Sequence, residues 1–131
     1  MHCDIRAENV LITHNKTTKL TNFKLSHKLS AAVLKLKNFN KFTLNQGKNL
    51  ERARYYAPEL LEGTPNFRYD YKCEVYSFGI LLWEIAEEKT PYKDYEDIMK
   101  IVDLVSEKYR ESFSVDSQMP VKFRNLALKG M

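Results

Sequence analysis

The sequence has few of the residues that mark several protein classes. Its only cysteines, Cys3 and Cys73, fit no metal-binding spacing, and two reduced thiols are a simpler expectation than a disulfide. Four glycines and four prolines in 131 residues leave little room for low-complexity linkers. No stretch approaches the ~20 apolar residues that span a membrane. The first twelve residues include Asp4, Arg6 and Glu8, which excludes a secretory signal. We expect one globular domain in the cytoplasm.

Acidic residues are absent from one long segment. Residues 9–50 contain eight lysines and no aspartate or glutamate, and the rest of the chain carries a net charge of −4, giving +4 overall. A lysine-only segment raises the local potential and favours an anionic partner, such as an acidic protein. The alternative is a solvated loop. Because aromatic and basic residues do not alternate as in nucleic-acid platforms, we expect no nucleic-acid partner.

The N-terminal half is predicted to contain only short strands and helices. Residues 9–21 are typical of two short strands around a turn, which predicts a small hairpin. Residues 31–50 lack a firm period and predict a long loop that can contain short helical pieces. Pro58 is well placed in the first turn of a short helix, which we expect to end at Gly63.

The C-terminal half is predicted to be helical. Residues 74–88 give the clearest helix, and we expect it to be buried nearly all round and to form the centre of the domain. A further helix is predicted at 95–109, with Ile98, Ile101, Val102 and Val105 on one face, and another at 121–129. The fold class is therefore mainly α with a small β-hairpin. The prediction for 74–88 depends on a stripe at helical spacing, widened by three more apolar residues: Val75, Phe78, Leu82 and Ile85, with Leu81, Trp83 and Ala86.

Four motifs resemble those of protein kinases. Residues 2–9, His-Cys-Asp-Ile-Arg-Ala-Glu-Asn, resemble the catalytic loop H-R-D-L-x-x-x-N. Asn22-Phe23-Lys24 stands thirteen residues after Asn9, where that family has D-F-G, and Ala57-Pro58-Glu59 matches A-P-E. Residues 73–85 resemble the central helix in the wording of tyrosine-kinase-like and tyrosine kinases.

The order of these motifs implies a partial protein kinase domain over residues 1–131. It corresponds to the lower, C-terminal lobe of the kinase α+β fold, without the N-lobe. The catalytic loop would occupy 2–9, the metal motif 22–24 and the activation segment 22–59.

The resemblance implies ATP-dependent phosphoryl transfer to protein hydroxyls. Asp4 would accept the proton of the substrate hydroxyl, and Arg6 would approach the transferring phosphate. Another interpretation makes Asp4 a loop carboxylate that caps backbone N–H groups. His2 and Phe23 would stack in the apolar column that links the two lobes of a kinase.

The resemblance also implies ATP and Mg²⁺ as cofactors. Asn9 and Asn22 would be the Mg²⁺ ligands, and Leu11 would lie under the adenine ring. Asn22 replaces an aspartate, so the site would lose one negatively charged ligand. A charge pair at ~4 Å and an effective dielectric of about 20 is worth at most on the order of 4 kcal/mol. The metal site is therefore expected to be weakened. Lys24 replaces a glycine; its ammonium either contacts phosphate in place of the metal or points to solvent.

Other departures concern the loop contacts of the family. Cys3 replaces an arginine that receives an activation-loop phosphate. Glu74 replaces an aspartate that hydrogen-bonds the catalytic-loop backbone, and its extra methylene still allows a looser contact. The chain ends before the arginine that pairs with the A-P-E glutamate, so Glu59 is expected to be a buried, unpaired carboxylate.

Three functions are compatible with these motifs. The chain lacks a Gly-rich loop and an ATP-contacting strand lysine, so the kinase-like fragment is expected to be inactive as given. The alternatives are a pseudokinase-type interaction module and a non-functional truncated paralogue. A protein substrate or signalling partner is expected, and Arg52 and Arg54 beside the lysine-rich segment suggest that it is acidic.

Overall fold

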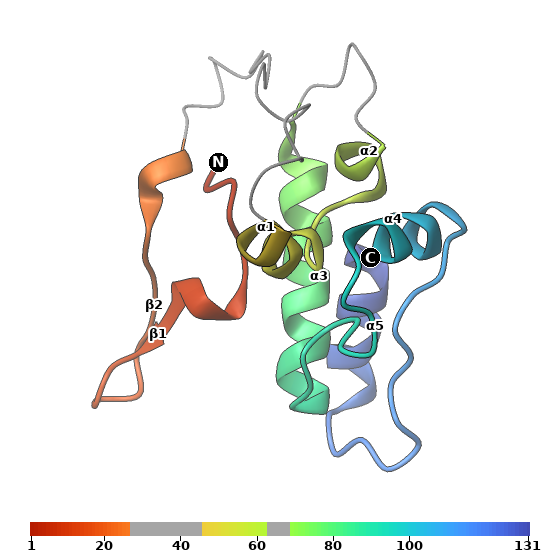
Figure 1. Cartoon of the computed structure of the whole chain (residues 1–131). Coiled ribbons are helices and arrows are strands. Elements are labelled where there is room, and N and C mark those ends of the chain that lie inside the picture. Colours follow the sequence, from red (N-terminus) through yellow and green to blue (C-terminus); the bar gives the residue numbers. More distant parts are fainter. Residues whose placement is uncertain (27–45, 63–68) are drawn as a thin grey trace.

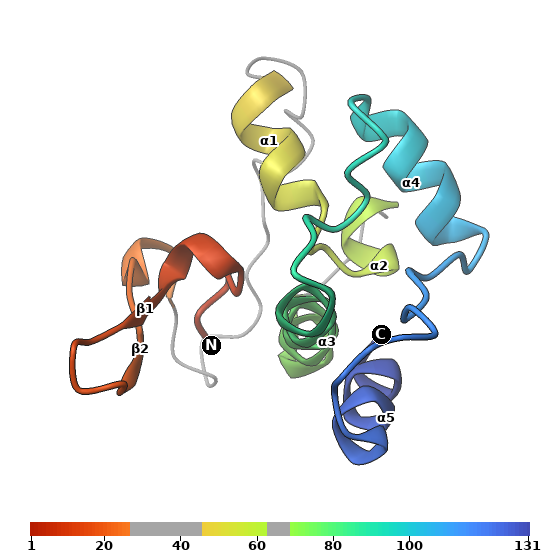
Figure 2. The ribbon, with the colours of Figure 1, turned by 90° about the horizontal axis from the view of Figure 1, so that it is seen from below.

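The structure is a computed structural model that describes residues 1–26, 46–62 and 69–131. It confirms the predicted mainly helical fold with a small hairpin. α3 lies at the centre, with the hairpin on one side and α5 on the other (Figures 1 and 2). The elements in chain order are the 3-10 helix η1 (Ala7–Asn9), β1 (Val10–Ile12), β2 (Thr18–Leu20), the 3-10 helix η2 (Phe23–Leu25), α1 (Gln46–Ala53), α2 (Pro58–Leu61), α3 (Tyr71–Glu87), α4 (Ile98–Ser106) and α5 (Val121–Gly130).

The N-terminal hairpin is antiparallel, as predicted for residues 9–21. Val10 pairs with Leu20, and Ile12 pairs with Thr18. The Thr13 N–H closes the turn by donating to the Thr17 carbonyl at 2.9 Å. The side chains of Ile12 and Leu20 are exposed, so hydrogen bonds rather than burial define this element.

α3 begins where a side chain can cap it. The Asp70 carboxylate accepts the N–H of Lys72 at 2.8 Å, which starts the helix before the predicted residue 74. The expectation that this helix is buried nearly all round is wrong. Val75, Phe78 and Ile85 are 48%, 47% and 47% exposed, because the described elements pack against the other faces of α3.

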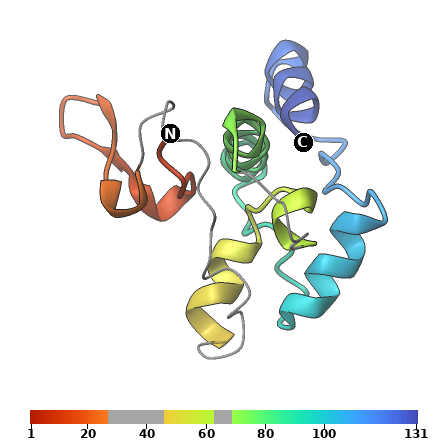
Figure 3. The same ribbon diagram turned by 90° about the horizontal axis from the view of Figure 1, so that it is seen from above.

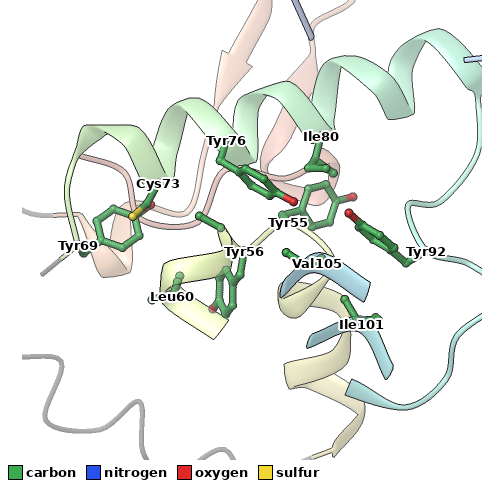
Figure 4. Packing of buried hydrophobic residues seen from close by; sticks show 11 residues of the cluster. Tyr55, Tyr56, Leu60, Tyr69, Cys73, Tyr76, Ile80, Tyr92, Ile101 and Val105 are labelled. Atoms are coloured by element: carbon green, nitrogen blue, oxygen red, sulfur yellow. The ribbon is translucent and has the colours of Figure 1, made fainter. Parts of the chain in front are cut away.

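The core is rich in tyrosine and lies between α2, α3 and α4 (Figure 4). Ile101 and Val105 of α4 are fully enclosed, which confirms the apolar face predicted for the helix at 95–109, although the helix starts later, after the cap Asp97. The cluster consists of Tyr55, Tyr56, Ala57, Leu60, Tyr69, Cys73, Tyr76, Ile80, Tyr92, Ile101 and Val105.

α3 and α5 touch through their backbones. A Cβ atom at Gly79 would lie 2.8 Å from the Ala127 carbonyl oxygen and 2.9 Å from the Met131 nitrogen. Glycine therefore permits the close approach. Arg110 fixes the C-terminal end, since its Nε donates to the Met131 carbonyl at 2.9 Å and its guanidinium lies over the Tyr76 ring.

α1, α2 and α4 pack side by side on another face of α3 (Figure 3). α2 has Pro58 in its first turn, as predicted, whereas its predicted end at Gly63 lies outside the described residues. The loop predicted for 31–50 is corrected in its last part, because residues 46–50 belong to α1; residues 31–45 lie outside the described ranges. In the described part of the chain, no helix combines the length and apolar character needed to cross a bilayer.

Candidate functional site

Asp4 lies in the loop before η1 and is covered by two arginines. Its side chain is 2% exposed, and its Oδ1 atom lies 3.2 Å from Nε of Arg6 and 3.6 Å from Nε of Arg52. Arg6 comes from the same loop and also pairs with Glu8, whereas Arg52 comes from α1. Two guanidinium groups from different elements therefore compensate the charge of one buried carboxylate.

The Arg52 contact is a part of this site that the sequence did not predict. Arg52 stood out only as a possible docking residue, and nothing in the local pattern links it to the catalytic-loop motif. The contact arises because α1 brings its last turn against the loop at Asp4.

Asn9 and Asn22, the two predicted Mg²⁺ ligands, lie side by side. The Asn9 Nδ2 group donates to the backbone carbonyl of Asp4 at 2.7 Å, and its Oδ1 atom accepts from Nδ2 of Asn22 at 3.2 Å. Asn9 is buried at the end of η1. Asn22 has φ 64° and ψ 53°, a left-handed conformation that asparagine tolerates better than most residues.

The amide pair is a poor Mg²⁺ site. It offers two neutral oxygens, and Mg²⁺ is normally held through charged carboxylates. The Asn9 oxygen already accepts a hydrogen bond from Asn22, and the nearby Asp4 carboxylate faces arginines. Within the described ranges, no three His, Cys, Asp or Glu side chains are grouped so that they could hold a metal ion. The residues present do not fit the ion.

His2 and Phe23 form the predicted contact. Their ring centroids are 4.9 Å apart at an interplanar angle of 64°, an edge-to-face arrangement. Nε2 of the buried His2 donates to the Thr21 carbonyl at 2.8 Å, which fixes the ring beside the strand end. Leu11 and Lys24 are both exposed. The adenine contact of Leu11 and the choice for Lys24 between phosphate and solvent stay predictions.

Glu74 ties the backbone of the loop at Cys3 to α3. The Cys3 N–H donates to its Oε1 atom at 2.6 Å, so the predicted reach of the longer side chain is confirmed and the contact is tight. Cys3 has φ 65° in this turn. Burial, aided by the Glu74 charge, raises the pKa of the Cys3 thiol to about 11, so this thiol is protonated at neutral pH.

Two predictions about charged residues are wrong. Arg54 was expected to help dock an acidic partner, but its guanidinium is buried and donates to the backbone carbonyls of Pro91 at 2.8 Å, Tyr95 at 3.3 Å and Tyr92. It therefore stabilises the loop after α3 through these hydrogen bonds. Glu59 was expected to be buried without a partner; its side chain is exposed and accepts from the Cys73 thiol at 3.6 Å, so the burial cost does not arise.

A comparison with protein families agrees with this geometry. The family model described as protein tyrosine and serine/threonine kinase matches residues 1–128. The chain belongs to the protein kinase family.

Similar kinases include serine/threonine and dual-specificity members. A probable LIM domain-containing serine/threonine-protein kinase of Dictyostelium discoideum is 38% identical over 94 residues, which is 72% of this chain and 12% of that protein. A probable serine/threonine-protein kinase of Clostridium perfringens is 24% identical over all 131 residues and 17% of its own length. The dual specificity protein kinase shkC of Dictyostelium discoideum is 30% identical over 120 residues, 92% of this chain and 20% of that kinase. The chain thus spans a fifth or less of these relatives.

Proposed function

We propose that this chain is a kinase-like module that engages other proteins without transferring phosphate. The closed position of Asp4 carries the proposal. A carboxylate that takes the proton of a substrate hydroxyl must come within hydrogen-bond reach of it. Here the Asp4 side chain is 2% exposed and Arg52 of α1 lies against it. A substrate hydroxyl has no approach to Asp4 while α1 keeps this position.

The amide pair supports the same proposal. Protein kinases use ATP and Mg²⁺, and the metal ions neutralise the phosphate charge during transfer. Asn9 and Asn22 supply no negative charge for such an ion. As part of the proposal, we assign residues 2–9 to the catalytic loop, 22–24 to the metal motif and 22–59 to the activation segment. Both cysteines are free, which fits the intracellular setting that the proposal assumes.

The direct test is a transfer assay on the purified full chain. Radiolabelled ATP, Mg²⁺ or Mn²⁺ and a mixed peptide substrate are incubated with the chain and with its Asp4→Ala variant. We expect both proteins to give the label incorporation of a protein-free blank. Incorporation by the chain that Asp4→Ala abolishes would contradict the proposal.

A second candidate is an enzyme held in a closed state. It is favoured by two kinase-like contacts that the chain keeps, the bond from Cys3 N to Glu74 at 2.6 Å and the contact between His2 and Phe23. Arg52→Ala separates the two candidates because it uncovers Asp4. A closed enzyme would gain transfer in that variant and lose it again when Asp4→Ala is added. The module that we propose should transfer no phosphate in either variant.

The interaction half of the proposal needs its own measurement. The tagged full chain, its Asp4→Ala variant and a core variant, Ile101→Ala, are each used for quantitative co-purification. We expect the first two to retain the same partner proteins and the third to lose them, because binding should require the fold and not the catalytic carboxylate. Equal retention by the core variant, or none by the unaltered chain, would argue against a folded interaction module.

A further inference from the structure

The hydrogen-bond network fixes how the two asparagines face each other. A backbone carbonyl only accepts, so the Asn9 group that faces the Asp4 carbonyl at 2.7 Å must be its NH₂ group. The Asn9 oxygen then points away from this carbonyl. It meets Asn22 at 3.2 Å, so Asn22 must present its own NH₂ group. The order of donors and acceptors follows from the carbonyl at one end of the chain of bonds.

This order makes Asn22 a required donor. We propose that the Asn9–Asn22 amide pair replaces a divalent cation as the link between the loop at Asp4 and the segment that begins η2. An N–H group of Asn22 occupies the electropositive position that a cation would take opposite the Asn9 oxygen. The link therefore does not depend on Mg²⁺.

The surroundings of the pair strengthen this inference. Asn9 is buried, and its backbone carbonyl also accepts the N–H of Thr21 at 2.9 Å, so both its side chain and its backbone are engaged. Rotation of the Asn9 amide would place its oxygen against the Asp4 carbonyl, and two buried acceptors without a proton between them are costly. Asn9 therefore cannot turn to suit a changed neighbour.

The substitution Asn22→Asp should turn this hydrogen-bonded pair into a repulsive one. The new carboxylate would face the Asn9 oxygen, and the two acceptors would repel each other. A divalent cation between them would remove the repulsion and gain a charged ligand. The inference deepens the proposed function, but it is measured by cation binding and not by phosphate transfer, so either one can fail alone.

The experiment measures thermal unfolding of the full chain and three variants in EDTA and in 10 mM Mg²⁺. We expect the unaltered chain to melt at the same temperature in both. Asn22→Asp should melt about 3 to 6 °C lower in EDTA and recover most of that loss in Mg²⁺. Asn22→Ala should melt lower with no recovery. The matched control is Asn15→Asp in the exposed hairpin turn, which makes the same charge change away from the pair and should show neither effect.

A second measurement covers the case in which Asn22→Asp fails to fold. Mn²⁺ broadens the NMR signals of groups close to it, and the side-chain amides of Asn9 and Asn22 report directly on this position. In the unaltered chain we expect no selective broadening of these amides at millimolar Mn²⁺. Selective broadening there would overturn the inference. So would unchanged melting of Asn22→Ala, or a folded Asn22→Asp variant that Mg²⁺ does not stabilise.

Discussion

The hairpin half of this chain (residues 1–26) and the helical half (residues 46–62 and 69–131) are held together by different forces. In the helical half, the tyrosine-rich cluster between α2, α3 and α4 removes large side chains from water, and Ile101 is 0% exposed. In residues 1–26, several large apolar side chains stay at the surface, with Leu11 54%, Ile12 74% and Phe23 60% exposed. The hairpin half keeps its shape through polar contacts from buried groups.

The difference matters because the proposed site lies on the polar half. The side chains of His2, Asp4 and Asn9 are buried there by hydrogen bonds and ion pairs. Hydrogen bonds are directional, and their loss costs most when a buried group is left unsatisfied. A single substitution can thus alter the site while the helical half stays folded. The comparison predicts large global effects from core changes and small local effects from hairpin changes.

The largest effect is expected from Ile101→Ala. Removing a fully enclosed aliphatic side chain leaves a cavity and should lower the free energy of unfolding by about 2–5 kcal/mol. The matched hairpin change, Leu11→Ala, should cost less than about 0.5 kcal/mol because that side chain is already exposed. Urea unfolding followed by circular dichroism measures both. Similar losses in the two variants would remove the basis of the comparison.

A smaller and more local effect is expected from Glu74→Ala. This change leaves the Cys3 N–H without the carboxylate that it meets at 2.6 Å, a charge-assisted bond of about 1.5–3 kcal/mol. The cost should fall on residues 1–26, so hydrogen exchange should speed up there and stay unchanged in α3 and α4. Glu107→Ala, at the exposed end of α4, is the control. Uniform acceleration over the whole chain would show that the two halves unfold together.

Local sequence patterns predicted most of the elements. A short apolar β-type run and a turn predicted the hairpin, Pro58 predicted the start of α2, and the spacing of Ile101 and Val105 predicted the buried face of α4. These succeed because the pattern and the structure depend on the same few neighbouring residues. The motif comparison also correctly predicted that Glu74 bonds the backbone of the loop at Cys3.

The failures concern contacts between distant segments. The stripe through Val75 and Phe78 has helical spacing, but spacing cannot say which face other elements will cover. The Asp4–Arg52 pair depends on where α1 docks, and α1 itself lies in a region without a clear period. The direct bond between Asn9 and Asn22 depends on atom positions, although the motif did indicate that the two residues meet.

The smallest effect concerns the two thiols, one in each half. Burial is the main cause that raises the pKa of Cys3 to about 11 and that of Cys73 to about 12, from an ordinary 9.0. A raised pKa means that the folded state holds the thiol proton more tightly than the unfolded state. The resulting stabilisation is complete below pH 9 and is lost as the pH rises through 11 to 12. At pH 8.5 the folded chain should contain on the order of 100-fold less thiolate than the unfolded chain.

Alkylation by iodoacetamide at pH 8.5 then reports on the two halves separately. Both thiols should react slowly in buffer and rapidly in urea. Cys3 should react before Cys73, because the hairpin half can open while the core remains closed. The single variants Cys3→Ser and Cys73→Ser identify which thiol is labelled. If Cys73 reacted as fast as Cys3, the core would be opening as often as the hairpin half, and the two halves would not open independently of each other.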